Sequence, residues 1–314
     1  MSKQINKIAV IGTGVIGTGW IIRMLSHNKK VTAFDLNFQQ KKILMKEIKR
    51  AIPFVKKLFK KKRINIKNLK FNTSLKETIK DADFIQECVS ENYKLKTKLM
   101  SEIGKYSKYN AIISSSSSGL LPSIIFSKCK NPSRGLIGHP FNPVYMLPAV
   151  EIIPGKKTSK NSLDKANNFY KSISMNPVKV SKELPGYLAD RLQEALWREG
   201  LHIINEGHAT TEQLDRAIED GPGLRWSLMG TFLTFHLAGG KSGMKHMLEQ
   251  FGPALKLPWT KLKAPNLSSK LINRLVEGTK KQSKRRSVEK ISRIRDQYLL
   301  DLLLMRKKYE KKLR

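Results

Sequence analysis

The stretch "KIAVIGTGVIG", residues 7–17, decides the fold of this chain. It opens with a short apolar run rich in β-branched side chains, which predicts a buried parallel strand over 7–14. Its three glycines have the spacing G-x-G-x-x-G, and residues 17–28 then have the apolar spacing of a helix. A glycine turn between a buried strand and a helix is typical of a phosphate-binding loop.

The turn also indicates which ligand it binds. Gly12 permits the tight turn, Gly14 lets the backbone approach a pyrophosphate, and Gly17 lets helix and strand pack closely. Asp35 lies near the end of a second predicted strand, over 30–36, where a carboxylate accepts hydrogen bonds from the ribose hydroxyls and repels a 2′-phosphate. We therefore predict an NAD site rather than an ordinary glycine-rich turn. The candidate cofactor-binding residues here are Gly12, Thr13, Gly14, Val15, Ile16, Gly17 and Asp35.

The pattern of the whole chain predicts two domains. Up to residue 185 strands alternate with helices, which is typical of an α/β, Rossmann-type doubly wound parallel sheet. The further strands are predicted over 82–89, 110–117, 134–140, 149–154 and 176–181, and the further helices over 38–60, 94–105 and 159–173. Pro185 and Gly186 mark the boundary, so we expect an NAD-binding domain over 1–185 and an all-α domain over 186–314.

The second domain is expected to hold six helices. They are predicted over 187–206, 210–220, 225–238, 240–250, 267–282 and 287–310. The last carries an apolar stripe, which we expect to pack on its own domain or on a second subunit. The stripe consists of Ile291, Ile294, Tyr298, Leu302 and Met305.

The charge of the chain is strongly positive: 60 Lys and Arg stand against 25 Asp and Glu, a net charge of +35. Such a field attracts nucleic acid or an anionic membrane surface. The basic residues are spread along the chain, however, and no zinc-finger or RNP-like pattern accompanies them. A solvated, lysine-rich surface is the favoured interpretation, and a basic nucleic-acid or membrane-surface binding protein is the alternative.

Other features point to the cytoplasm. No apolar run reaches the roughly 18 residues that a membrane helix needs, and no signal peptide precedes the first strand. Cys88 and Cys129 are far apart and lack metal-ligand spacing, so we expect neither a disulfide framework nor a metal site.

The stretch "GHPFNPVYMLPAVEI", residues 138–152, contains one histidine, His139, and one glutamate, Glu151, and no other charge. An unpaired glutamate is costly in an apolar setting, so the two are expected to pair across adjacent strands. Such a histidine can remove a hydroxyl proton while the carboxylate fixes its tautomer. Ser118, at the carboxyl end of a strand, would position the substrate oxygen. A purely structural His–Glu pair is the alternative.

Together with "SENYKLK", "SSSSSGLLPS" and "PGYLADRL", these stretches resemble the 3-hydroxyacyl-CoA dehydrogenase family. The resemblance implies an NAD-binding Rossmann domain, a helical dimerising domain and therefore a homodimer. It implies that His139 is the catalytic base, Glu151 its orienting partner and Ser118 the residue that binds the substrate hydroxyl.

The resemblance also implies further site residues. Glu91 and Lys96 would flank the nicotinamide end of NAD, and Asn142 would lie near the reaction site. Asp190 departs from the family, which usually has asparagine there, and a carboxylate cannot donate to a substrate carbonyl. It either pairs with a nearby arginine or contributes negative potential to the substrate pocket.

Three C-terminal stretches, "EALWREGLHIINEGHATTEQLD", "GPGLRWSLMGTFLTFHLAGG" and "FGPALKLPWTKL", resemble the branch of this family that oxidises the 3-hydroxyl of carnitine. The predicted ligand is thus a small cationic 3-hydroxy acid. Arg225 could bind its carboxylate and aromatic faces its trimethylammonium. The candidate rings are Tyr145, Trp197, Trp226, Phe232, Phe235 and Trp259, each with core packing as its alternative role. "GPGLR" also resembles an L-gulonate 3-dehydrogenase relative, so another 3-hydroxy acid or a 3-hydroxyacyl-CoA stays open as the substrate.

Overall fold

The computed structural model describes residues 5–226 and 229–260, and beyond them 268–269, 272–273, 276–277, 280, 283–287, 290–291, 294 and 305. The chain divides into two compact units, residues 1–192 and 193–314. Every described strand lies in the first unit.

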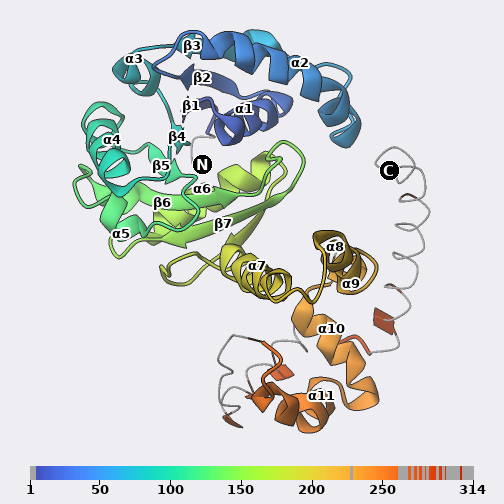
Figure 1. The fold of residues 1–314 in the computed structure, drawn as a ribbon. Helices are drawn as coiled ribbons and strands as arrows, with labels where there is room; N and C mark the ends of the chain where they lie inside the picture. The colour runs from blue at the N-terminus through green and yellow to red at the C-terminus, as the bar shows by residue number, and fades with distance from the viewer. Residues whose placement is uncertain are drawn as a thin grey trace. The chain divides into compact units, whose positions relative to one another are not determined.

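The first unit is built on one eight-stranded sheet with the order β3-β2-β1-β4-β5-β6-β7-β8 (Figure 1). The predicted Rossmann-type doubly wound sheet is confirmed. The strands are β1 (Lys7–Ile11), β2 (Lys30–Phe34), β3 (Leu69–Asn72), β4 (Phe84–Glu87), β5 (Ile112–Ser115), β6 (Gly135–Pro140), β7 (Ala149–Pro154) and β8 (Asn176–Lys179).

The sheet is parallel except at one pairing near its edge. The strands from β3 to β6 are parallel to one another, whereas β7 pairs antiparallel with β6 and parallel with β8. The reason is the connection over 141–148, which is too short for the crossover that two parallel strands need.

Helices cover both faces of the sheet (Figure 1). One face packs against α1 (Val15–Ser26), α2 (Gln40–Leu58) and α6 (Lys160–Ser172), and the other against α3 (Leu75–Ile79), α4 (Tyr93–Tyr106) and α5 (Pro122–Ile125). Ile8 and Val10 of β1 join the first core, and Ala9 and Ile11 join the second. A strand buried on both faces has no polar side, which explains the unbroken apolar run that identified it.

Every described element after the sheet is helical, which agrees with the predicted all-α second half. These elements are α7 (Ala189–Asn205), α8 (Thr211–Glu219), α9 (Pro222–Trp226), α10 (Thr231–Ala238), η3 (Gly240–Ser242), α11 (Met244–Phe251) and η4 (Gly252–Lys256). The first unit has two further short turns, η1 (Ile66–Asn68) and η2 (Pro132–Arg134).

Two of the predicted helices are interrupted. The prediction of one helix over 225–238 is wrong, since Gly230 is extended, with φ −70° and ψ 178°, and caps the start of α10. The helix predicted over 240–250 starts late, because Gly243 has φ +62° and precedes α11. The helices predicted over 267–282 and 287–310 fall mostly outside the described residues, as do Tyr298 and Leu302 of the apolar stripe. None of the described helices combines the length and apolar character that crossing a bilayer requires.

Candidate active site

The predicted site residues of the first unit lie near the carboxyl edge of the sheet. Strands β1, β2, β4, β5 and β6 are parallel, so the residues that follow them meet at this edge. The strand order changes direction at β1, which lies between β2 and β4. Ligands of open α/β sheets bind at such a switch point.

The glycine turn joins β1 to α1 at that point. Gly12 has φ +93°, and a Cβ there would lie 2.8 Å from the carbonyl oxygen of Cys88. A Cβ on Gly17 would lie 1.9 Å from the carbonyl oxygen of Gly12. Only glycine therefore fits at Gly12 and Gly17, since any side chain would push the two strands or the helix apart.

Gly14 is different, because a Cβ there would meet no atom within 4 Å. It stands at the N-terminus of α1, where the first backbone N–H groups of a helix have no intrahelical acceptor. Val15, the first helical residue, is exposed. Open space beside free backbone donors and a positive helix end suits the pyrophosphate of a dinucleotide.

Asp35 closes this part of the site. Its Oδ2 accepts hydrogen bonds from the N–H and the hydroxyl of Thr13, at 3.0 and 2.8 Å. Its Oδ1 accepts from the N–H of Asn37 at 3.2 Å. The carboxylate at the end of β2 is thus tied to the turn after β1, where it can hold a ribose hydroxyl and disfavour a 2′-phosphate.

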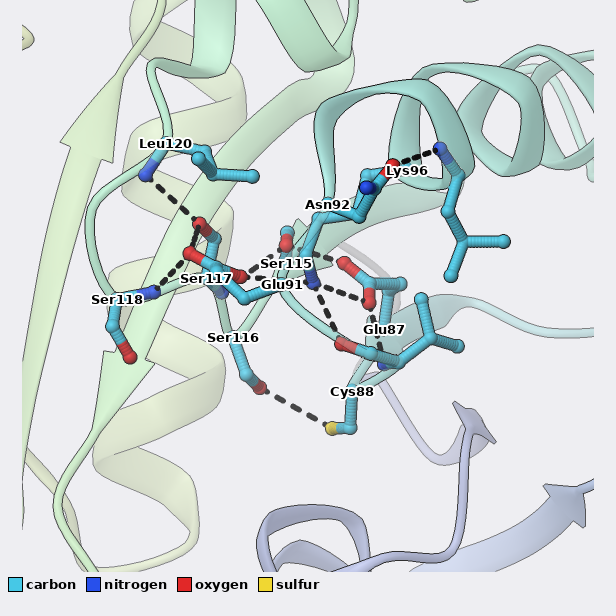
Figure 2. Close-up of polar contacts among 12 residues, drawn as sticks. Glu87, Cys88, Glu91, Asn92, Lys96, Ser115, Ser116, Ser117, Ser118 and Leu120 are labelled. Carbon is cyan, nitrogen blue, oxygen red and sulfur yellow. Dashed lines mark hydrogen bonds and ion pairs between the residues drawn. The ribbon is translucent and has the colours of Figure 1, made fainter.

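Glu91 holds the serine loop, residues 116–119, that follows β5 (Figure 2). Its Oε1 accepts from the hydroxyl of Ser117 at 2.5 Å, from the N–H of Ser118 at 3.0 Å and from the N–H of Gly119 at 3.3 Å. Figure 2 shows the hydroxyl of Ser118 directed away from this carboxylate. Ser118 is exposed, so its hydroxyl is accessible to a substrate.

Lys96 makes three polar contacts inside the protein. Its side chain is buried, with Nζ 2.7 Å from Oε1 of Glu87, 3.0 Å from the carbonyl oxygen of Val89 and 3.5 Å from Oε2 of Glu91. Glu87 was not among the predicted site residues, although a glutamate inside the apolar strand "ADFIQECV" was a usable signal. The contact of Glu91 and Lys96 with NAD stays a prediction.

His139 and Glu151 pair as the strand pattern predicts. They are direct partners in the antiparallel ladder of β6 and β7, and Nδ1 of His139 lies 2.9 Å from Oε2 of Glu151. Both side chains are buried. With Nδ1 donating to the carboxylate, Nε2 of the neutral ring is left to accept a proton.

Glu151 is also held from the other side. Its Oε1 accepts from the N–H groups of Leu188 and Ala189, at 2.9 and 3.1 Å. Burial favours the neutral carboxyl, but the hydrogen bonds from His139, Ala189 and Leu188 outweigh it and lower the pKa of Glu151. The partner of the imidazole is therefore an ionised carboxylate.

A second carboxylate lies at the opposite ring nitrogen. Oδ2 of Asp190 is 3.6 Å from Nε2 of His139, and the Asp190 side chain is one-third exposed. Negative charge there favours a cationic ligand nearby.

Tyr187 connects His139 to the serine loop. Its ring centroid lies 5.7 Å from that of His139, and its hydroxyl donates to the carbonyl oxygen of Leu120 at 2.7 Å. Tyr187 has φ +44°, which is uncommon for an aromatic residue and marks local strain. Tyr187 thereby contacts both His139 and Leu120, the residue that follows the serine loop.

The connection between β6 and β7 is held by a buried arginine. Arg23 of α1 donates to the carbonyl oxygens of Val144 at 2.7 Å and Leu147 at 2.9 Å. Burial lowers the pKa of Arg23 to about 10. Asn142 lies exposed in the same connection. Arg23 was not among the predicted site residues, although a charge inside the apolar stretch "GWIIRMLS" is unusual.

The remaining candidates belong to the second unit, apart from Tyr145. Arg225 and Trp226 are exposed at the end of α9, and Trp197, Phe232, Phe235 and Trp259 are also exposed. Their roles in substrate binding stay predictions. Among the described residues, no cluster of three or more His, Cys, Asp or Glu could hold a metal ion.

Known proteins match this chain over most of its length. The family model described as 3-hydroxyacyl-CoA dehydrogenase, NAD binding domain, matches residues 7–184, and that of the 3-hydroxyacyl-CoA dehydrogenase C-terminal domain matches 186–285. The chain is 50% identical to an L-carnitine dehydrogenase of Bacillus cereus, over 98% of this chain and 94% of that one. It is 48% identical to the L-carnitine dehydrogenase of Pseudomonas putida, over 96% and 94% of the two chains.

Solved structures support the fold. A 3-hydroxyacyl-CoA dehydrogenase of Archaeoglobus fulgidus superposes with a TM-score of 0.71 at 22% identity, covering 96% of this chain and 98% of that one. The NAD cofactor predicted from the glycine turn agrees with the matched domain and with the open cradle at Gly14. The chain belongs to the 3-hydroxyacyl-CoA dehydrogenase family.

Proposed function

We propose that this protein is an NAD-dependent dehydrogenase that oxidises the 3-hydroxyl of L-carnitine to 3-dehydrocarnitine. The observation that carries the choice of substrate is the 50% identity to an L-carnitine dehydrogenase over nearly the whole chain. The pairing of His139 with Glu151 and the exposed hydroxyl of Ser118 support the chemistry, because alcohol oxidation needs a base beside the hydroxyl.

In this proposal His139 is the catalytic base. Its Nε2 takes the proton of the 3-hydroxyl, and Glu151 holds Nδ1–H and stabilises the imidazolium that forms. Ser118 positions the substrate oxygen by hydrogen bonding. Bound NAD would supply the acceptor for the hydride that leaves C3. Gly14, the start of α1 and Asp35 would hold the cofactor.

The charges near His139 suit a cationic substrate. Carnitine carries a trimethylammonium group, which has no N–H and is held by aromatic faces and by nearby negative charge. Asp190 supplies such a charge 3.6 Å from Nε2 of His139. We propose that Arg225 binds the carboxylate of the substrate and that Trp226 is one of the aromatic residues around its trimethylammonium group.

The proposal includes the organisation of the chain. We assign NAD binding to residues 1–185 and substrate binding and dimerisation to 186–314. A homodimer is expected, and light scattering in solution tests it. We place the enzyme in the cytoplasm, since Cys88 and Cys129 are both free thiols.

A substrate panel tests the proposed function. The rate at which the purified protein reduces the cofactor is measured from the absorbance of the reduced form. The substrates are L-carnitine, L-gulonate, 3-hydroxybutyrate and 3-hydroxybutyryl-CoA, each tested with NAD and with NADP. We expect the highest kcat/KM with L-carnitine and NAD. A higher kcat/KM with gulonate or with the CoA ester would assign another substrate of the same reaction. Reduction of NADP as fast as NAD would contradict the role of Asp35.

A further inference from the structure

A buried ion pair lies next to β5, the strand that leads into the serine loop. Glu87, the last residue of β4, and Lys96, in the first turns of α4, are 0% and 1% exposed, and their charged atoms are 2.7 Å apart. Removing two charges from water is costly unless each polar atom is satisfied. Here the N–H of Val89 also donates to Oε1 of Glu87 at 2.6 Å, and Ser115 donates to Oε2. So complete a set of contacts fixes the Glu87 carboxylate in one position.

Two routes lead from Glu87 to the serine loop (Figure 2). In the first, Lys96 lies between Glu87 and Glu91, and Glu91 accepts from the N–H groups of Ser118 and Gly119. In the second, the hydroxyl of Ser115 donates to Glu87 and accepts from the N–H of Ser117 at 3.2 Å. Both routes end on consecutive residues of one loop.

We propose that Glu87 is a positioning residue for Ser118: through Lys96–Glu91 and through Ser115 it fixes the main chain that presents the Ser118 hydroxyl to the substrate. Glu87 touches neither of the proposed reacting groups, and its effect on turnover passes through the loop. The inference rests on the proposed role of Ser118 in the dehydrogenase reaction. It explains why a chain with so many exposed lysines buries Lys96 in particular.

The test combines amide hydrogen exchange with steady-state kinetics on the full-length protein. In Glu87→Gln we expect the amides of Ser118 and Gly119 to exchange about tenfold faster, because Glu91 is no longer fixed. We expect kcat with L-carnitine to fall about tenfold, with the KM for NAD nearly unchanged, since misplacing a reacting group by an ångström can cost up to about 100-fold. Ser115→Ala breaks only the second route, keeps all charges and should give a smaller loss, so it replaces Glu87→Gln if that variant does not fold.

Asp83→Asn is the matched control. Asp83 precedes the opposite end of β4, pairs with Lys108 at 3.3 Å and accepts from the N–H of Lys7 at 3.1 Å. This variant should lose stability without faster exchange at Ser118 and Gly119. If kcat falls as much in Asp83→Asn as in Glu87→Gln, the loss of kcat in Glu87→Gln is explained by general destabilisation of the protein. That result would overturn the proposal.

A double-mutant cycle with Ser118→Ala separates the inference from the proposed function. If Glu87 acts through Ser118, Glu87→Gln should lower kcat little further in the Ser118→Ala background. Additive losses would overturn the positioning role while leaving the dehydrogenase assignment intact. A Ser118→Ala variant with full activity would refute the role of Ser118 and, with it, this inference. If L-carnitine is not oxidised at all, the exchange rates still decide whether Glu87 fixes the loop.

Discussion

Nδ1 of His139 and Oε2 of Glu151 lie 2.9 Å apart across the antiparallel ladder of β6 and β7. This contact exists because the short connection over 141–148 reverses β7, so that residues twelve positions apart become direct neighbours. The reversed edge of the sheet therefore creates the proposed catalytic pair.

Replacing the carboxylate of this pair by an amide should lower turnover strongly. Glu151→Gln keeps the size of the side chain but can no longer stabilise the imidazolium or fix the tautomer of His139. We expect kcat to fall by about 100-fold or more, as for other carboxylate–histidine pairs. Initial rates at saturating L-carnitine and NAD measure the loss. Glu183→Gln, at another glutamate that accepts a backbone N–H, is the control and should keep normal turnover.

The same carboxylate should make stability depend on pH. Burial raises the pKa of Glu151, but its hydrogen bonds from His139, Ala189 and Leu188 lower it more, so its folded-state value lies below 4.5. The folded protein binds a proton on Glu151 more weakly than the unfolded chain does. The ionised carboxylate therefore stabilises the fold fully above the pKa of Glu151 in the unfolded chain, and this stabilisation is lost as the pH falls through its pKa in the folded protein. The free energy of unfolding should therefore differ most between wild type and Glu151→Gln near neutral pH, and less below about pH 4.5. Urea unfolding at several pH values measures this, and an unchanging difference would argue against the ionised pair.

Gly14→Ala should impair NAD binding without impairing the fold. A Cβ at this position meets no protein atom within 4 Å, so the free energy of unfolding should stay within about 0.5 kcal/mol of wild type. The methyl group would instead occupy the space proposed for the pyrophosphate, and we expect the KM for NAD to rise about tenfold or more.

Gly230→Ala is a close control for this change. Gly230 also caps a helix in an extended conformation and also has open space where the Cβ would lie. Its replacement should leave the KM for NAD unchanged. Equal effects of the two substitutions would show that the space beside Gly14 is not the cofactor site.

Asp190→Asn should change the preference for substrate charge. The carboxylate near Nε2 of His139 favours a cationic ligand, and an amide of the same size does not. We expect kcat/KM for L-carnitine to fall about tenfold, since the loss of a contact worth about 1.4 kcal/mol lowers kcat/KM tenfold. The value of kcat/KM for 3-hydroxybutyrate, which lacks the trimethylammonium group, should stay level or rise. A parallel fall for both substrates would indicate that Asp190 serves His139 alone.

The parts of the fold that bury apolar side chains on both faces could be predicted from the sequence. The run "KIAVI" and the glycine turn after it identified β1, α1 and the cofactor site, because burial on both faces leaves no polar positions. Strand β3 over Leu69–Asn72 was not predicted, because its residues are exposed or half-buried at the edge of the sheet. Helices α3 and α5 were not predicted either, because they are too short for a helical period to show.

The site was predictable where chemistry restricts the residue type, and less so where it depends on tertiary contacts. A lone histidine and a lone glutamate in an apolar stretch indicated the pair His139–Glu151. The burial of the Lys96 side chain was not predictable, because it depends on an ion pair with Glu87, which lies in a different element. The contact of Asp190 with His139 was likewise not anticipated, since it depends on how the chain turns at Gly186 and Tyr187, both with positive φ.

The most direct test of the account is the turnover of His139→Ala with saturating L-carnitine and NAD, measured beside the affinity of the same variant for NAD. With the base removed and the cradle at Gly14 intact, we predict a kcat at least about 100-fold below wild type and an unchanged Kd for NAD. Turnover close to that of wild type in a variant that still binds NAD would contradict the proposed role of His139.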